Sequence, residues 1–244
     1  IQVGLSYVQA GKIVTFGIKP TRPETGYGYL ELQADVLDKS GTSELVAFIE
    51  KPSIKLAREM LDAGNFLWNA GIFLFRATEM IDAFKSYAPE TLDFVLKAFD
   101  HSSQDLGFLR LGKTPWSMLK DISIDYAIME KARNLVAVPY TSKWSDLGGW
   151  DAVWAESNPD LLGNVTSKSA HAIDCLDSLL RSENDNQQVV GIGLNNILAI
   201  AMHDAVLVAN KSRAQDVKMV VELLREKHIN QAEIFPKDFR PWGW

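Results

Sequence analysis

Short apolar runs alternate with amphipathic segments from the beginning of the chain to about residue 154. The apolar runs predict β-strands over residues 13–18, 46–50 and 68–75. The amphipathic segments have apolar residues at helical spacing and predict helices over 53–63, 78–87, 89–99 and 123–132. Gly64 directly follows the first of these helices, which is common at a helix end. This alternation is typical of an α/β domain.

The pattern changes from residue 164 onward. Short, evenly spaced apolar runs then begin at Val189, Ile197 and Ala205. They predict consecutive short β-strands or coils of β-structure. A helix is expected from about residue 213 to 228, because Ser212 and Gln215 stand in a capping-box relation before an apolar stripe. We expect this helix to dock on the strands.

Turn signals separate the two patterns, at Asn158-Pro159-Asp160 and at Gly163-Asn164. We therefore place a domain boundary here. The prediction is an α/β domain over 1–160, a smaller β-rich domain with a closing helix over 161–235, and the start of a linker over 236–244.

Composition narrows the class of protein. The 244 residues are 47% hydrophobic and 23% charged, as in ordinary globular proteins. The net charge is −6 and the basic residues are scattered, which argues against a nucleic-acid surface. A single cysteine, Cys175, cannot form an internal disulfide and favours a reducing, cytoplasmic compartment. No apolar stretch approaches the ~20 residues that cross a bilayer, so no membrane segment is expected.

Several common active-site motifs are missing from the sequence. It has no G-x-S-x-G motif, no Walker-type loop and no Cys or His pair at metal-binding spacing. Four other segments combine polar residues with glycines, prolines or aromatic residues, and these are 20–29, 50–52, 67–75 and 144–150.

The first two segments each follow a predicted strand. In Pro20 to Tyr29, prolines fix φ and glycines let a ligand approach the backbone, which predicts either a rigid loop over a polar substrate or a structural turn. In Glu50-Lys51-Pro52, a carboxylate beside an ammonium can hold a sugar hydroxyl and a phosphate together. A solvated ion pair is the commoner explanation of such a tripeptide.

The other two segments place single polar residues in unusual surroundings. Asn69 and Gly71 interrupt an apolar strand, so the amide bonds either a ligand hydroxyl or the backbone of a β-bulge. Asp146 lies between two tryptophans and before a glycine pair, where it is either a Mg²⁺ ligand or the first residue of an Asx turn. Asp125, at a predicted helix start, is either a cap or a ligand contact.

Together these segments resemble one family. In chain order they are PTRPETGYGY at 20–29, IEKP at 49–52, LWNAGIF at 67–73, SIDYAIMEK at 123–131 and WSDLGGW at 144–150. The match continues at 204–208, at 214–218 and in RPWG at 240–243. Their order and spacing resemble those of bacterial mannose-1-phosphate guanylyltransferases over nearly the whole chain.

The resemblance implies a Rossmann-like nucleotidyltransferase domain followed by a smaller β-rich domain. It implies an enzyme that makes GDP-mannose and pyrophosphate from GTP and mannose 1-phosphate. In this enzyme Lys51 would bind the sugar phosphate and Asp146 would be a Mg²⁺ ligand, both with catalytic roles. The implied substrate-binding residues are Thr25, Gly26, Tyr27, Gly28, Glu50, Asn69, Gly71 and Asp125. A homodimer is a candidate assembly, and RPWG resembles the linker to an isomerase domain.

Two parts of the family pattern have no counterpart in the sequence. One is the N-terminal glycine-rich loop G-G-x-G-T-R-L-x-P, which cradles GTP in the family, with an upstream metal-binding Asp; the other is the isomerase domain. The residues present therefore do not determine which nucleotide base the protein binds, and we expect the chain by itself to be inactive. The alternatives are a non-catalytic sugar-phosphate-binding or oligomerisation fragment, and a nucleotidyltransferase for another hexose 1-phosphate.

Overall fold

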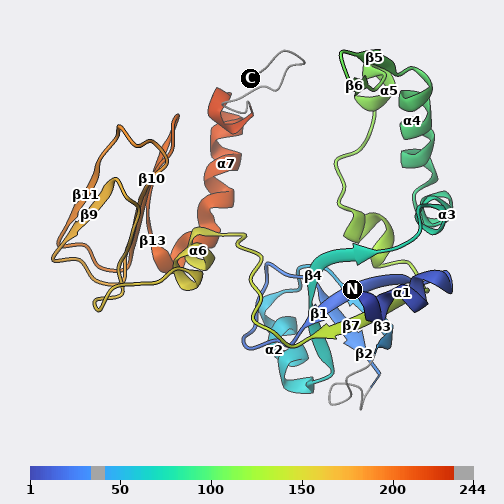
Figure 1. Ribbon diagram of the computed structural model, residues 1–244, viewed down its shortest axis with the longest axis horizontal. Helices are drawn as coiled ribbons and strands as arrows, with labels where there is room; N and C mark the ends of the chain where they lie inside the picture. Colours follow the sequence, from blue (N-terminus) through green and yellow to red (C-terminus); the bar gives the residue numbers. More distant parts are fainter. Residues whose placement is uncertain (34–41, 234–244) are drawn as a thin grey trace. The chain divides into compact units, whose positions relative to one another are not determined.

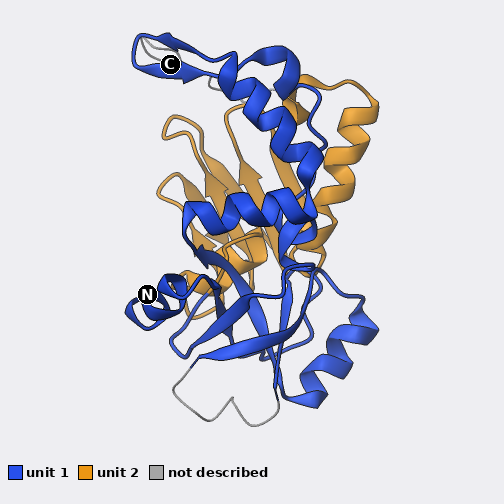
Figure 2. Ribbon diagram, turned by 90° about the vertical axis from the view of Figure 1, so that its right-hand side faces the viewer, with its two compact units in different colours: residues 1–144 blue, residues 145–244 orange. Residues whose placement is uncertain are grey.

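The computed structural model describes residues 1–33 and 42–233 of the chain (Figure 1). The chain forms two compact units, residues 1–144 and 145–244, which have different colours in Figure 2. The linker expected over 236–244, with its RPWG motif, lies outside the described residues.

The two units divide earlier in the chain than the boundary predicted at residue 160. The reason is helix α6 (Trp150–Glu156), whose side chains Val153 and Trp154 pack against the buried Leu179 and Leu198 of the second unit. This apolar packing assigns the helix to the second unit, although the turn signals follow it in sequence.

Five β-strands form the centre of unit 1. They are β1 (Ile13–Ile18), β2 (Tyr29–Leu32), β3 (Ser43–Ile49), β4 (Phe66–Leu74) and β7 (Leu135–Tyr140). The strands close into a barrel in the order β1-β4-β2-β3-β7, in which β1 and β7 are parallel and the other neighbours antiparallel. All three predicted strands are present. The prediction of mixed α/β structure is confirmed.

Unit 1 also contains helices, some beside these strands and others farther from them (Figure 1). They are α1 (Gln2–Gln9), α2 (Ile54–Ala63), α3 (Ala77–Tyr87), α4 (Pro89–Asp100) and the short α5 (Lys113–Trp116). Helix α2 begins and ends as the sequence predicts: the Ser53 hydroxyl accepts the Leu56 N–H at 3.3 Å, and Gly64 has a left-handed φ of 75°. Its buried face, Ala57 and Met60, joins Tyr29 and Trp68 in one apolar cluster.

The segment predicted as an α-helix over 123–132 is instead a π-helix, η1 (Asp125–Met129). The Glu130 N–H donates to the Asp125 carbonyl at 3.0 Å, which is the i→i+5 bond of a π turn. Three consecutive residues of η1 are buried: Ala127, Ile128 and Met129. They lie in the main core cluster of unit 1, with Ile13, Leu30 and Leu67, so the segment is fixed by core packing.

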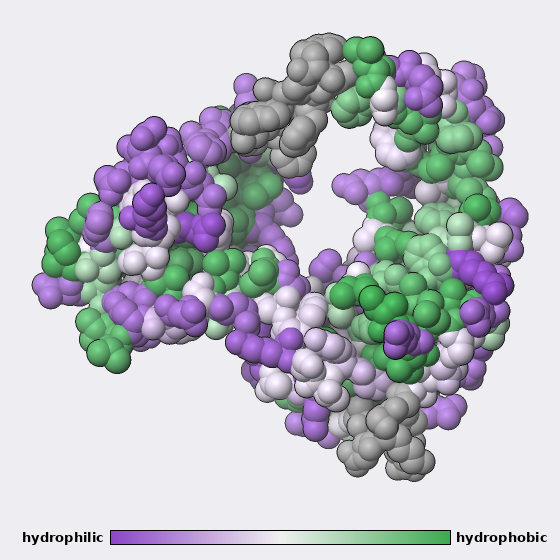
Figure 3. All heavy atoms as spheres, in the orientation of Figure 1, coloured by the Kyte–Doolittle hydropathy of each residue, from purple (hydrophilic) through white to green (hydrophobic). Residues whose placement is uncertain are grey.

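Helices α4 and α5 and the segment between them form an arm of unit 1 (Figure 1). It contains the hairpin of β5 (Ser103–Asp105) and β6 (Phe108–Arg110). Its exposed large hydrophobic residues include Leu96, Phe99, Leu106 and Trp116. Figure 3 shows hydrophobic and hydrophilic residues sharing the surface of this arm.

Unit 2 is built mainly of short β-strands. They are β8 (Val165–Thr166), β9 (Ala170–Ile173), β10 (Leu179–Ser182), β11 (Val189–Ile192), β12 (Ile197–Ala201) and β13 (Val206–Asn210). Strand β10 pairs in parallel with β8 and β12, and β9 pairs in parallel with β11. Val165, Leu179 and Leu198 therefore stack in register, as in successive coils of a β-helix. The predicted coils of β-structure are present.

The closing helix of unit 2 differs from its prediction. A 3₁₀-helix, η2 (Lys211–Asp216), comes first, then α7 (Val217–Glu226) and a final 3₁₀ turn, η3 (Asn230–Ala232). The expected capping box of Ser212 and Gln215 is wrong, because the Asn210 side chain caps the segment and accepts the Ser212 N–H at 3.0 Å. Ala214 of η2 is the residue buried against the strands. Among residues 1–33 and 42–233, no helix is long and apolar enough to cross a membrane.

Candidate active site

The candidate site in unit 1 begins where strand β3 ends. Ile49 is the last residue of β3 and pairs with Tyr29 of β2. The next two residues turn away from the ladder, and Lys51 has a φ of 46°, in the left-handed region. The Lys51 N–H donates to the Tyr27 carbonyl at 3.2 Å, and the Glu50 N–H donates to the Glu130 carboxylate at 3.0 Å. Two hydrogen bonds thus hold this turn.

The side chains of the turn form an ion pair. The Lys51 Nζ lies 3.1 Å from the Glu50 Oε1, and the Glu50 side chain is 7% exposed whereas that of Lys51 is 47% exposed. Burial raises the pKa of the Glu50 carboxyl, Lys51 opposes this, and Asp125 and Glu130 add to it. The hydrogen bond to Glu50 raises the pKa of Lys51. The pair has a buried carboxylate and an accessible ammonium, so it is not a fully solvated pair.

Gly28 provides the space for the Glu50 carboxylate. A Cβ atom at this position would lie 2.6 Å from the Glu50 Oε2 and 3.3 Å from the Asn69 Cβ. A contact of 2.6 Å is too short, so any side chain at this position would require the Glu50 carboxylate to move. The Gly28 carbonyl also accepts the Asn69 N–H at 2.7 Å, which joins the 20–29 segment to β4.

Asn69 lies in β4 at a β-bulge and is 8% exposed. Its amide oxygen accepts the Thr15 hydroxyl at 2.9 Å and the Gly71 N–H at 3.1 Å. Gly71 has a φ of 69°, which allows the bulge. The bulge interpretation of this segment is therefore correct. Both bonds fix the amide orientation, so its NH₂ group faces Asp125, whose Oδ1 lies 3.5 Å away.

The loop from residue 20 to 29 packs over an aromatic group. The Tyr27 ring meets the rings of Trp68 and Trp144 edge to face, with centroids 5.3 and 5.6 Å apart. The guanidinium of Arg22 lies over the Trp68 ring, 5.4 Å from its centroid. These contacts hold the loop against Trp68 and Trp144.

Glu24 contacts other residues of the same loop. Its carboxylate accepts the Gly26 N–H at 3.1 Å and pairs with Arg22 at 3.0 Å. Its own N–H donates to the Tyr29 hydroxyl at 2.9 Å. Thr25, next to these anchored residues, is exposed. The loop is thus both a structural turn and a surface that a ligand can reach.

The structure brings together most of the residues predicted for the site. Within unit 1, direct contacts connect Gly28, Glu50, Lys51, Asn69, Gly71 and Asp125, while Tyr27 and Gly26 lie in the adjoining loop.

Asp146 belongs to unit 2, in the segment that leads into α6. Leu147 has a φ of 50°, and a Cβ on Gly148 would lie 2.2 Å from the Asp146 Oδ2. The Asp146 carboxylate therefore occupies space that a Cβ atom on Gly148 would fill. In the described part of the chain, no three His, Cys, Asp or Glu residues group as metal ligands. A single carboxylate suits Mg²⁺, which takes one or two carboxylates together with substrate phosphates and water.

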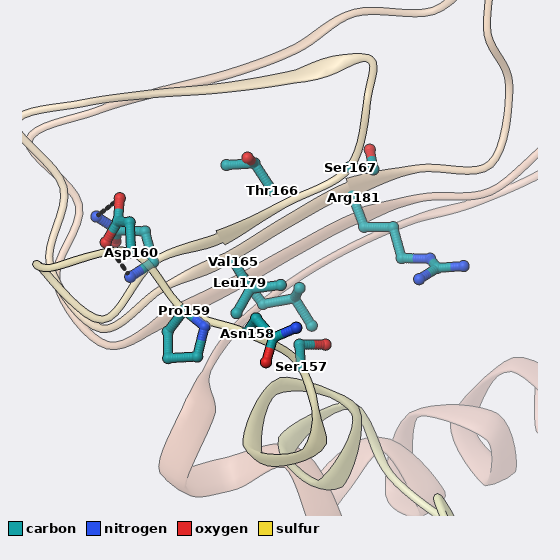
Figure 4. Close-up of a pocket in the computed structure, with 10 residues that line it drawn as sticks. Ser157, Asn158, Pro159, Asp160, Val165, Thr166, Ser167, Leu179 and Arg181 are labelled. Carbon is teal, nitrogen blue, oxygen red and sulfur yellow. Dashed lines mark hydrogen bonds between the residues drawn. The ribbon is translucent and has the colours of Figure 1, made fainter.

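A separate cavity of about 540 Å³ lies in unit 2, beside β8 and β10 (Figure 4). It contains none of the predicted site residues. Arg181, Thr166 and Ser167 line it. Asp160, also in its wall, accepts the backbone N–H groups of Leu162 and Asn164 at 2.9 and 2.8 Å, so this carboxylate closes its own loop.

Sequence reasoning missed two residues that contact the site. Thr15 lies in a continuous apolar strand, where threonine is an ordinary strand residue. Glu130 lies five residues after Asp125, a spacing that a helical pattern does not place on one face. The available signal for Thr15 was its position as a polar side chain within the apolar run 13–18.

Two family models match successive parts of the chain, in the same order as the two units of the fold. The family model "Nucleotidyl transferase" matches residues 6–162. The family model "MannoseP isomerase/GMP-like beta-helix domain" matches residues 170–224, in agreement with the stacked parallel strands.

Individual relatives cover nearly the whole chain. It is 38% identical to mannose-1-phosphate guanylyltransferase RfbM of Salmonella typhimurium, over 97% of this chain and 49% of that protein. It is 36% identical to the alginate biosynthesis protein AlgA of Pseudomonas syringae pv. tomato, over 96% of this chain and 48% of that protein. The chain spans about half the length of the curated relatives it matches.

A solved structure has the same fold. It is described as mannose-1-phosphate geranyltransferase from Thermus thermophilus, with 28% identity and a TM-score of 0.72, over 92% of this chain and 64% of that one. The family match covers more than half of the chain, and the relatives exceed 30% identity over almost all of it. The chain therefore belongs to the nucleotidyl transferase family and carries a β-helix domain of the mannose-phosphate isomerase/GMP-like type.

Proposed function

We propose that the protein containing this chain makes GDP-mannose and pyrophosphate from GTP and mannose 1-phosphate, and that unit 1 holds the sugar phosphate. The observation that carries this proposal is the Glu50–Lys51 pair at the end of β3, with a buried carboxylate 3.1 Å from an accessible ammonium. Similarity to a protein named mannose-1-phosphate guanylyltransferase supports this choice of substrates.

The polar groups of unit 1 suit a sugar phosphate. The Lys51 ammonium is half exposed and offers a mobile positive charge to the phosphate. The Glu50 carboxylate accepts hydrogen bonds from sugar hydroxyls, and the Asn69 amide is held with its NH₂ group toward Asp125. Gly26 and Gly71 let the sugar approach the backbone closely, and Gly28 leaves the space that the Glu50 carboxylate occupies. Thr25 and Tyr27 are the further sugar contacts that we propose in the 20–29 loop.

The proposed reaction is an in-line displacement at phosphorus. A phosphate oxygen of mannose 1-phosphate attacks the α-phosphorus of GTP. The new P–O bond forms as the bond from the α-phosphorus to the pyrophosphate oxygen breaks, and no covalent enzyme intermediate is needed. The protein mainly orients two anions and offsets their charge, and Lys51 does this on the sugar-phosphate side.

Asp146 is the residue of this chain that would hold Mg²⁺. Its carboxylate is the kind of ligand that this ion takes, and Gly148 leaves room for it. When bound, the ion would lower the negative charge of the phosphates.

Other parts of the sequence-based prediction extend this proposal. Cys175 is buried and unpaired, which fits a reducing, cytoplasmic compartment. The proposed protein partner is a second copy of the chain, in a homodimer. The similarity to an alginate biosynthesis protein supports polysaccharide synthesis as the use of the product.

The test is pyrophosphate release by the intact protein with GTP, mannose 1-phosphate and Mg²⁺. We expect release that requires both substrates and falls when glucose 1-phosphate replaces mannose 1-phosphate or ATP replaces GTP. Binding of mannose 1-phosphate without release would support a non-catalytic binding module. Faster release with glucose 1-phosphate would support a transferase for another hexose 1-phosphate.

A further inference from the structure

We infer that Glu130 is a positioning residue for the proposed reaction: its carboxylate accepts the Glu50 backbone N–H and thereby sets the turn that presents Glu50 and Lys51 to the sugar phosphate. The inference rests on the proposed function for its catalytic consequence. The contact itself, from the Glu50 N–H to the Glu130 Oε1, measures 3.0 Å and joins residues 80 apart in sequence.

The Glu50 N–H needs an acceptor from outside the sheet. The ladder between β2 and β3 ends with the pair Tyr29 and Ile49, so Glu50 is the first residue past the last pair. The Lys51 N–H donates to Tyr27 on the β2 side, so the Glu50 N–H points to the other edge of β3, where the pairing with β7 involves Ser43 and Glu44. Glu130 supplies the acceptor at this edge.

The same turn contains a backbone conformation that has to be held. Lys51 has a φ of 46°, which non-glycine residues rarely adopt. Such a conformation persists only where surrounding contacts determine it. Here the contacts are the Glu50 N–H bond to Glu130 and the Lys51 N–H bond to Tyr27, at 3.0 and 3.2 Å. Loss of the first leaves one backbone bond to define where the Lys51 ammonium points.

The π turn explains how Glu130 reaches this place. In an α-helix, five residues advance about 140° past one full turn, so Asp125 and Glu130 would face different directions. The i→i+5 bond between the Glu130 N–H and the Asp125 carbonyl instead brings the two residues above one another. Asp125 then faces the Asn69 amide and Glu130 faces the Glu50 N–H.

The core holds the π turn in this register. Three residues that lie between Asp125 and Glu130 in the sequence have buried side chains, namely Ala127, Ile128 and Met129. Ile128 and Met129 are fully buried in the main cluster of unit 1. A shift of η1 to α-helical geometry would rotate these side chains, so packing in the core and the direction of Glu130 are coupled. π-bulges are frequent at functional sites, which agrees with this placement.

The kinetic test compares three substitutions in the intact protein. Glu130→Ala removes the acceptor, Glu130→Asp shortens it, and Glu130→Gln keeps an amide oxygen in the same place. We expect Ala and Asp to raise the KM for mannose 1-phosphate about tenfold with the KM for GTP unchanged, and Gln to stay within about twofold of the wild type. Glu90→Ala is the control, because Glu90 forms an exposed ion pair with Lys120 on the arm.

A second measurement tests the contact without relying on turnover. Hydrogen exchange of the Glu50 amide should accelerate at least tenfold in Glu130→Ala and Glu130→Asp, and should stay near the wild-type rate in Glu130→Gln. Unchanged exchange in both the Ala and Asp variants would overturn the inference. So would an equal rise in KM for Gln and Ala, because charge rather than the acceptor would then be responsible. An inactive wild type with the expected exchange pattern would refute the proposed function and leave the positioning contact established.

Discussion

The Thr15 hydroxyl donates a hydrogen bond of 2.9 Å to the amide oxygen of Asn69, 54 residues later in the chain. Both residues are buried, and they lie on the neighbouring strands β1 and β4. The Gly71 N–H bonds the same amide oxygen. The amide therefore has one orientation, with its NH₂ group toward Asp125 and the candidate site.

Thr15→Val should release this amide while keeping the shape of the side chain. We expect a loss of about 1–2 kcal/mol in the free energy of unfolding, because the Asn69 oxygen loses one of its two donors inside the protein. The kcat/KM for mannose 1-phosphate should fall about tenfold, and Thr15→Ser, which keeps the hydroxyl, should restore most of it. Urea unfolding and steady-state kinetics measure both effects. Equal kinetics for Val and Ser would show that the amide orientation has no part in substrate binding.

Gly28→Ala should displace the Glu50 carboxylate. The added Cβ would lie 2.6 Å from the Glu50 Oε2, so the Glu50–Lys51 pair must move or the strand must shift. Overpacking of this kind costs about 1–3 kcal/mol. We expect this loss in a denaturant titration, together with a higher KM for mannose 1-phosphate.

The matched substitution for stability is Gly26→Ala in the same loop. There a Cβ would meet only the Glu24 carboxylate, at an ordinary 3.4 Å. Its free energy of unfolding should stay within about 0.5 kcal/mol of the wild type. If Gly28→Ala is as stable as Gly26→Ala, then the space beside Glu50 is larger than the structure indicates.

The site residues that could be predicted from the sequence are polar residues that interrupt an apolar pattern. Glu50 and Lys51 end an apolar run and Asn69 interrupts another, so each stands out against its neighbours. The strands were predictable from their apolar runs. For example, β1 is apolar apart from Thr15 and is buried at nearly every position.

The partners of these residues were not predictable, because they come from elements far away in sequence. Thr15 is an ordinary residue for a strand, and only the register of β1 against β4 shows its contact with Asn69. Glu130 follows Asp125 by five residues, and a pattern based on 3.6 residues per turn places them apart. The π turn that brings them together depends on core packing, which no local pattern records.

Lys51→Ala should raise the KM for mannose 1-phosphate at least tenfold and lower kcat, because the phosphate loses its ammonium partner and the buried Glu50 carboxylate loses its counterion. Lys51→Gly should lose activity equally. Its stability should exceed that of Lys51→Ala by about 1 kcal/mol, because a left-handed φ of 46° suits glycine. Kinetics and urea unfolding of the two variants separate the charge from the backbone. A Lys51→Ala enzyme with wild-type kinetics would remove Lys51 from the proposed site.

Asp146→Ala should abolish the metal dependence of turnover. The proposed role of Asp146 is to hold Mg²⁺, so the substitution should lower kcat by at least a hundredfold at any Mg²⁺ concentration. Binding of mannose 1-phosphate, measured by calorimetry without GTP, should remain near its wild-type affinity, because the sugar-phosphate residues belong to unit 1. A Mg²⁺ titration with the wild-type midpoint and rate would exclude Asp146 as the ligand.

Ionisation of Glu50 is harder in the folded protein than in the unfolded chain, and this sets the sign of a pH effect on stability. Burial raises the pKa of Glu50 above the ordinary 4.5, Lys51 opposes the shift, and Asp125 and Glu130 add to it. The carboxyl therefore contributes stability that is complete below 4.5 and is lost as the pH rises through the folded pKa. Glu50→Gln removes this titration, so its free energy of unfolding relative to the wild type should increase from about pH 4 to about pH 8. Urea unfolding across this range measures the difference, and a constant or decreasing value would contradict the raised pKa.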